Sequence, residues 1–273
     1  MSDERQRGMT EVEEKSVGSL SAPRSLVIYE VVRRQGDEEL RRPTGSLFWS
    51  GVAGGVTIMA SVIAQGAFHQ KLPADLPGRE AISDLGYSLG FLMVILGRMQ
   101  LFTEQTIVTV LPVMAEPGWR KLGRTAWLWG VVFAANMVGT ATAAAINVYL
   151  RLMSPELLAS MLDVSGPLSH KAPLDVLCQG VPAGFLIASV AWIRAGVSGG
   201  EFWIVLVLTY AIALGSFAHV IAGGAEAFLL LFAGQVSVLH ALGGIILPAL
   251  AGNILGGTGL FALLAHAQVR QEI

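Results

Sequence analysis

Two polar residues, Thr103 and His219, each stand where a long hydrophobic segment is interrupted. Thr103 follows Leu101 and Phe102, and its hydroxyl can donate a hydrogen bond to the oxygen of a desolvated ligand. His219 precedes two glycines at 223–224, which would let a helix unwind and turn backbone groups toward a channel. Its imidazole can donate, accept or carry a proton near neutral pH. The two residues favour a polar site in a pore, and the alternative for each is a hydrogen bond within or between helices.

Three further ionisable residues, Arg98, Glu104 and Glu226, also lie in hydrophobic segments. A charged side chain at membrane depth is costly unless it faces a cavity or a partner. Removing one member of a buried ion pair is more damaging than removing both. We therefore expect these residues to form a buried ion-pair network that holds interrupted helices together, rather than to contact a substrate.

A lysine and two asparagines complete the set of candidate residues. Lys171, next to His170, lies just ahead of the fourth hydrophobic segment. A cation at a pore mouth raises the local concentration of anions, although position alone fits an ordinary loop lysine equally well. Asn136 and Asn253 occupy matching places in two similar segments. We expect their amides to tie the backbone of the interrupted helices to a neighbouring helix.

The composition identifies the class of protein that positions these residues. Of the 273 residues, 53% are hydrophobic and 14% are charged, and the mean hydropathy is +0.60, which is too apolar for a typical soluble domain. Segments of about 20 apolar residues can cross a membrane as helices. The sequence predicts an all-α membrane protein with six such spans, near residues 46–68, 81–114, 124–150, 173–195, 202–232 and 239–266. The second and fifth are long and are predicted to be broken.

The two halves of the chain resemble each other. Residues 51–55 and 180–184 both begin with Gly-Val and end in glycine, and each is followed by Ala-Ser-Val; Asn-x-x-Gly then occurs at 136–139 and again at 253–256. The breaks at 101–103 and 217–219 fall between these matches. Three spans per copy is an odd number, so the second copy should enter the membrane inverted. Such repeats place a substrate site near the midplane, at their interface.

Charge and composition predict the arrangement of the termini. Basic residues are concentrated in the N-terminal segment and on the loops expected to share its side, so both termini are predicted to be cytoplasmic. We expect residues 1–22 to be disordered, 23–45 to form an amphipathic interfacial or plain solvated helix, 46–268 to form the channel domain and 269–273 to form a short cytoplasmic tail. The single cysteine, Cys178, is expected to pack in a span. Neither a removable signal peptide nor a nucleic-acid-binding pattern is expected, and we expect no metal or cofactor.

Four motifs together resemble the formate/nitrite transporter family over roughly residues 44 to 268. They are Gly-Tyr-Ser-Leu-Gly-Phe at 86–91 leading to Gln-Leu-Phe-Thr at 100–103, His170-Lys171, His219, and Gly-Asn-Ile-Leu-Gly-Gly at 252–257. The chain also resembles a divergent bacterial inner-membrane subgroup with Gln-Leu-Phe-Thr-Glu. The resemblance implies an aquaporin-like fold, a homopentamer surrounded by lipid in the bacterial inner membrane, and a pore for small monovalent anions in each protomer.

The same resemblance implies roles for individual residues. Thr103 and His219 would be the central polar pair, and Lys171 would attract the anion. Two apolar constrictions would flank the pair, an inner one at Tyr87, Phe91 and Ile212 and an outer one at Leu101 and Phe102. Several positions depart from the family pattern: Ala218 replaces a glutamate, Gly223 an asparagine, Gln179 an asparagine and Glu104 a small residue. These changes put the substrate in doubt more than the architecture.

Three functions are compatible with the sequence. The first is a channel or transporter for formate, nitrite or a similar anion, which crosses the apolar rings as the neutral acid because a bare anion would meet a large desolvation cost. The second is a pore for water or a neutral solute, or a scaffold that does not conduct. The third is an intramembrane serine protease with Ser198 in a Gly-x-Ser-Gly pattern, although no histidine is placed as its base.

Overall fold

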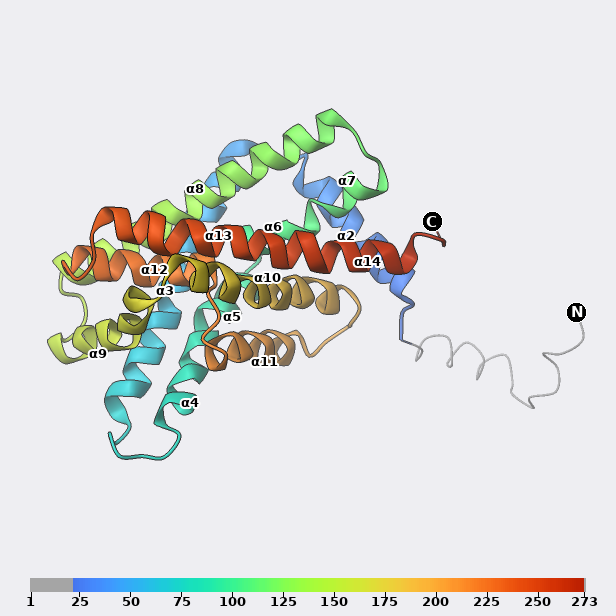
Figure 1. Ribbon diagram of the computed structural model, residues 1–273. Coiled ribbons are helices and arrows are strands. Elements are labelled where there is room, and N and C mark those ends of the chain that lie inside the picture. Colours follow the sequence, from blue (N-terminus) through green and yellow to red (C-terminus); the bar gives the residue numbers. More distant parts are fainter. Residues whose placement is uncertain (1–21, 273) are drawn as a thin grey trace, which may run out of the picture.

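The computed structural model describes residues 22–272, which form helices and contain no strand (Figure 1). Within this range four helices are long and apolar enough to cross a membrane: α3 (Thr44–Lys71), α8 (Trp119–Tyr149), α10 (Pro173–Ala195) and the helix His240–Val269. The last of these contains two wide π-helical stretches, η4 (His240–Ile246) and η5 (Leu255–Ala262), around α13 (Leu247–Ile254), and it ends in α14 (Leu263–Val269). The expectation for residues 1–21 lies outside the described residues.

The second and fifth expected spans are made of shorter helices. The chain from 79 to 115 forms α4 (Arg79–Asp84), η2 (Leu85–Tyr87), α5 (Ser88–Leu96), α6 (Phe102–Val108) and α7 (Leu111–Ala115). The chain from 201 to 232 forms α11 (Glu201–Leu214) and α12 (Val220–Phe232). Between the halves lie α9 (Pro155–Ser165) and η3 (Gly166–His170). The expected count of six spans treats each interrupted segment as one crossing and stays a prediction.

Both interruptions are built in the same way. After α5 the chain turns at Arg98, whose φ is 55°, and after α11 it turns at Ser216, whose φ is 50°. A left-handed residue ends a helix and lets later N–H groups bond to its last carbonyls. Accordingly, Met99 N–H donates to the Val94 carbonyl and Phe217 N–H to the Ile212 carbonyl, each at 3.0 Å. The chain then runs extended into the first turn of α6 or α12.

Two glycine crossings hold the long helices together. In the first half, α3 packs on α8 at Gly55, where an added Cβ would overlap the carbonyl oxygen of Asn136. In the second, α10 packs on α13 and η5 at Gly184, where a Cβ would overlap the carbonyl oxygen of Asn253. Small residues let helix backbones approach closely in a membrane. The matches at 51–55 and 180–184 therefore mark the same crossing in each half, as the repeat predicts.

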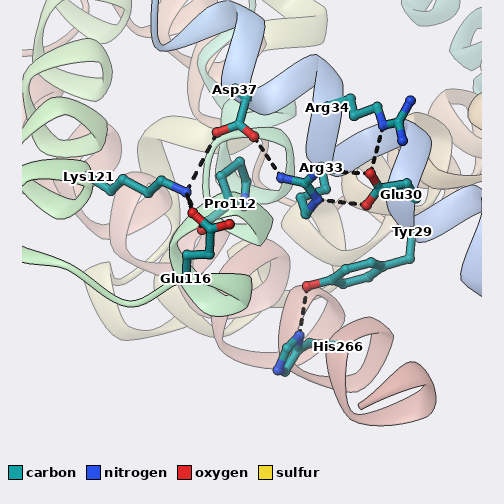
Figure 2. A network of polar contacts seen from close by, with 9 residues as sticks. All are labelled: Tyr29, Glu30, Arg33, Arg34, Asp37, Pro112, Glu116, Lys121 and His266. Carbon is teal, nitrogen blue, oxygen red and sulfur yellow. Dashed lines mark hydrogen bonds and ion pairs between the residues drawn. The ribbon is translucent and has the colours of Figure 1, made fainter. Parts of the chain in front are cut away.

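An additional helix, α2 (Ser25–Glu39), lies beside α14 and the chain around α7 (Figures 1 and 2). Tyr29 Oη and His266 Nδ1 are joined by a hydrogen bond of 2.8 Å. Arg33 bonds Glu30 and Asp37, each at 2.7 Å, and hydrogen bonding to Arg33 lowers the pKa of Glu30 to about 2. The expected helix within 23–45 is present, and its place at the membrane interface stays a prediction.

Replacing Gly184 by alanine tests the second crossing. Because the new Cβ would meet backbone rather than a movable side chain, we expect the variant to lose about 1–3 kcal/mol of stability. The matched control is Gly130→Ala in α8, where a Cβ meets nothing within 4 Å and helix propensity should improve by about 0.5–1 kcal/mol. Thermal unfolding of both proteins in detergent, followed by size-exclusion chromatography, measures the difference. Equal melting temperatures would contradict the close crossing.

Candidate functional site

Two cavities border the interrupted segments of the chain. The Arg194 cavity, about 340 Å³, is lined from α2, α5, α6, α10 and α11, with Glu39, Ile95, Gln100, Glu104 and Arg194 among its residues. The Lys171 cavity, about 440 Å³, is lined by Tyr87, Lys171, Ile212, His219 and Glu226 among others. Two cavities on opposite sides of a buried centre are the arrangement that a gated or narrow pore requires.

Thr103 and His219 meet at the buried centre. The distance between Thr103 Oγ1 and His219 Nε2 is 2.8 Å, and the two residues are 0% and 1% exposed. His219 is also the N-cap of α12, and its Nδ1 accepts the Ala222 N–H at 3.3 Å. Because Nδ1 accepts, a neutral ring carries its hydrogen on Nε2 and donates it to Thr103. Both ring nitrogens are therefore occupied.

Apolar side chains surround this pair. The Phe91 ring meets the His219 ring edge to face with centroids 4.8 Å apart, and Tyr87 packs on Phe91 at 5.1 Å. Leu101 and Phe91 are both fully buried. The ring of Phe102 packs sideways on aromatic residues of α8, namely Trp129 and Phe133. A solute passing the centre would therefore lose most of its water.

The order of the two expected constrictions is wrong. Tyr87 and Ile212 line the same cavity as Lys171. Because both termini are predicted to be cytoplasmic and Lys171 precedes the fourth predicted span, Lys171 is predicted to lie on the outside. Leu101 follows Gln100, which lines the Arg194 cavity beside α2. Tyr87 and Ile212, expected in the inner constriction, therefore lie on the side of Lys171. Leu101, expected in the outer constriction, lies on the side of the other cavity. From Tyr87 to Val108 the chain advances from the Lys171 cavity to the Arg194 cavity in sequence order, so the error came from the order implied by the family resemblance and not from the chain itself.

Asn136 fixes the first interruption. Its Oδ1 accepts the Phe102 N–H at 2.9 Å, and its Nδ2 donates to the carbonyls of Gly51 at 2.7 Å and Gln100 at 2.9 Å. One side chain on α8 thus joins α3, the extended chain and the first turn of α6. These three hydrogen bonds are the kind that the predicted architectural role requires.

Asn253 makes the same set of bonds in the second half. Its Oδ1 accepts the Val220 N–H at 2.8 Å, and its Nδ2 donates to the carbonyls of Gly180 at 2.9 Å and Ala218 at 2.8 Å. Asn253 is completely buried, as is Asn136. The two asparagines therefore define which residues of the halves are equivalent.

This equivalence corrects the repeat around the centre. Since Phe102 and Val220 receive the same asparagine bond, Thr103 corresponds to Ile221 and His219 corresponds to Leu101. Matching the two predicted breaks, 101–103 with 217–219, pairs Thr103 with His219 as equivalent positions, and this pairing is wrong by two residues. They meet because the two returning chains approach each other, not because the repeat superposes them.

The halves run in opposite directions between the cavities. Helix α3 reaches the Lys171 cavity near its end, at Gln65 and His69, whereas α10 starts beside Lys171 and reaches the Arg194 cavity at Ala191 and Arg194. Likewise α5 begins just after Tyr87 of the Lys171 cavity, and α11 ends there. Equivalent helices with opposite directions are what an inverted repeat predicts.

Lys171 lies in the turn between η3 and α10. Its Nζ donates to Gln179 Oε1 at 2.6 Å and to the Ser216 carbonyl at 2.8 Å, and burial lowers the pKa of Lys171. Gln179 therefore has a definite partner at the position where the family usually has asparagine. The ammonium ties the start of α10 to the second interruption and also borders the cavity.

The expected network of Arg98, Glu104 and Glu226 does not form. Glu104 instead pairs with Arg194 at 3.0 Å, and Arg194 also pairs with Glu201 at 3.0 Å. Arg98 has a side chain that is 69% exposed and lies 3.9 Å from Glu201. Glu226 lines the other cavity. Arg194 was not predicted as a site residue, although a lone arginine at the end of a span was a usable signal for a partner of Glu104.

Two other expectations concern residues away from the centre. Ser198 is exposed in the loop between α10 and α11, and in the described part of the chain it makes no side-chain hydrogen bond to a histidine, so a serine protease is not supported.

Cys178 is exposed rather than packed in the protein, because it faces outward from α10. Among residues 22–272 no group of three or more His, Cys, Asp or Glu is placed to hold a metal ion.

The chain belongs to the formate/nitrite transporter family, because the model of that family matches residues 26–267. It is 35% identical over 273 residues to the inner membrane protein YfdC of Escherichia coli (strain K12), which covers 100% of this chain and 86% of YfdC. The family suggested by the sequence motifs is thereby confirmed.

Two solved structures share the fold. A pentameric formate channel with formate bound has a TM-score of 0.72 at 17% identity, covering 84% of this chain and 98% of that one. An ion channel of the same family has a TM-score of 0.74 at 16% identity, covering 88% and 98%. These relatives are channels and transporters, so the chain is a membrane transport protein and not an enzyme.

Replacing Asn253 by alanine tests the support of the site. The change leaves the Val220 N–H and two carbonyls without their partner, and each buried unpaired group costs about 1–3 kcal/mol. We expect a loss of at least about 2 kcal/mol in thermal or denaturant unfolding. The control is Asn147→Ala, because Asn147 bonds only a carbonyl of its own helix and its Oδ1 has no partner. A similar loss in both variants would refute the special role of Asn253.

Proposed function

We propose that this protein transports small monovalent anions such as formate or nitrite through a pore in each protomer. The observation that carries the proposal is the contact of Thr103 with His219, buried between two cavities at the place where the two interrupted chains meet. The family supports it. So does the fold shared with a formate-bound channel.

The proposed route begins at Lys171, whose charge attracts the anion into its cavity. The solute then passes the apolar side chains of Tyr87, Phe91 and Ile212, the polar pair, and the apolar side chains of Leu101 and Phe102. Desolvating a bare charge there is costly. A weak acid that takes up a proton in the cavity avoids this cost, so we propose that it crosses as the neutral acid.

The proposed setting is a bacterial inner membrane, with both termini in the cytoplasm and lipid around a homopentamer. The basic N-terminal segment supports the orientation, and the relatives named above support the membrane and the assembly. Large exposed apolar side chains on the outer faces of the long helices, such as Trp49, Val138 and Leu263, fit contact with lipid or a neighbouring copy.

The assembly can be measured directly. Native mass spectrometry of the detergent-solubilised protein should give a particle of five chains of 28.9 kDa each. A stable monomer or dimer under gentle detergent conditions would contradict the homopentamer and leave the pore in each protomer unaffected.

A pore for a neutral solute is the second candidate, favoured by one observation. Four carboxylate side chains line each cavity, against one lysine in the Lys171 cavity and two arginines in the Arg194 cavity. An excess of negative charge at both mouths lowers the local concentration of free anions. Neutral molecules enter such cavities without that penalty.

Flux through liposomes separates the two functions. Uptake of formate, nitrite, hydrosulfide, acetate and water is compared from about pH 5 to about pH 8. This range includes the ordinary pKa of histidine, about 6.5. We expect formate and nitrite uptake that rises as pH falls, because the neutral acid becomes more abundant. His219→Ala, which removes the central polar group, should change formate uptake at least about tenfold.

The matched control is His170→Ala, because His170 is an exposed histidine outside the centre. It should behave like the unmodified protein. Water passage without uptake of any anion at any pH would refute anion transport and support the neutral-solute pore. Unchanged formate uptake and pH profile in His219→Ala would remove the central pair from the proposal.

A further inference from the structure

Transport as a neutral acid needs a group in the Lys171 cavity that supplies a proton. We propose that Glu226 is this group: its carboxyl protonates the entering weak acid anion beside His219 and is reprotonated from water in the cavity. The inference rests on the proposed function and adds a residue to it. Glu226 was predicted to have a structural role in an ion-pair network with Arg98 and Glu104, which does not form among the described residues.

Lys171 is poorly suited to give up a proton. Two of the hydrogens on its ammonium are committed to Gln179 and to the Ser216 carbonyl. A lysine also binds its proton far more tightly than a carboxylate does, with ordinary pKa values of about 10.4 against about 4.3 for glutamate. Proton transfer is most effective between groups of similar proton affinity. Lys171 therefore suits attraction, and a carboxyl suits donation to a small weak acid.

His219 is also poorly suited, because both ring nitrogens are already in use. Nδ1 accepts from Ala222 N–H, and Nε2 lies 2.8 Å from Thr103 Oγ1. Taking up a second proton at Nδ1 would break the N-cap of α12 and leave the Ala222 N–H buried without a partner, which is costly. The geometry therefore assigns His219 to holding and orienting the centre.

Glu226 has the position that a donor needs. On α12 the residues 219, 223 and 226 are one turn apart and share a face, and all three line the Lys171 cavity. Gly223 places no side chain between the other two, and a Cβ there would meet only Leu168 at 3.7 Å. In the described part of the chain the carboxyl of Glu226 has no hydrogen bond or ion pair. It therefore faces the open path toward His219.

Other charged and titratable groups also line the cavity. They are His69 at the end of α3, Glu80 and Asp84 of α4, Tyr87 of η2, Asp163 of α9 and Lys171 after η3. Asp84 accepts a hydrogen bond from Gln65 Nε2 at 2.8 Å, so it is already partnered. The surrounding carboxylates disfavour a negative charge on Glu226, while Lys171 favours it.

The proton balance closes without another reactant. The O–H bond of the Glu226 carboxyl breaks as an O–H bond forms on the anion, giving a carboxylate and the neutral acid. The acid moves past Thr103 and His219 and releases its proton on the far side. Hydronium in the Lys171 cavity then restores the Glu226 carboxyl, so each cycle carries one anion and one proton.

The test uses the full chain in liposomes with an internal pH dye and an inward formate gradient. Glu226→Gln should slow formate-linked acidification at least about tenfold, as expected for loss of a general acid, and flatten its pH dependence. Glu226→Asp should restore much of both. The control is Glu156→Gln, the same substitution at an exposed glutamate of α9 that is not among the residues lining either cavity, which should keep the original pH profile.

A second measurement needs no variant. Infrared difference spectra of the unmodified protein should show loss of a protonated carboxyl band when formate is added. Absence of any carboxyl change, or an unaltered rate and pH profile in Glu226→Gln, would overturn the role of Glu226 while leaving transport intact. If the unmodified protein took up no formate at any pH, the proposed function and this inference would both fall.

Discussion

Backbone groups exposed by a broken helix inside a membrane protein need protein partners, because lipid offers none. Two asparagine amides meet this demand. Asn136 and Asn253 each accept one first-turn N–H and donate to two carbonyls from different segments. Thr103 is adjacent to one of these anchored N–H groups and His219 to the other. The 2.8 Å contact at the centre therefore depends on both amides, and so does the separation of the two cavities.

The features that the sequence predicted well are those set by backbone geometry. Glycines at 55 and 184 and asparagines at 136 and 253 recur because a close helix crossing and an exposed first turn leave few side chains that fit. Such requirements act on residue type, so they remain visible as a repeat. The breaks near Thr103 and His219 were predictable for the same reason, since polar residues and glycines interrupt otherwise apolar segments.

The features that the sequence did not predict depend on how the chain returns after each break. Extended residues between helices shift the register by amounts that hydrophobic pattern does not encode, which is why His219 was matched to Thr103 rather than to Leu101. The partner of Glu104 is Arg194, 90 positions away, and nothing local selects it over Arg98. Depth in the pore was also misjudged, although residues 87 to 108 advance in sequence order from the Lys171 cavity to the Arg194 cavity, because the order of the constrictions was taken from the family resemblance.

The corrected register has a consequence for transport. An inverted repeat gives both halves similar backbones, yet their side chains at equivalent positions differ. Leu101 is equivalent to His219, and Thr103 is equivalent to Ile221, so each half supplies one polar group and one apolar group to the centre. Both ring nitrogens of His219 are engaged in bonds that preserve this arrangement. A centre that is polar at one narrow point and bounded by Phe91 and Leu101 penalises a free anion that has to pass it. A solute that gains a proton before the centre and loses it afterwards meets no such penalty, because it is neutral where desolvation is greatest.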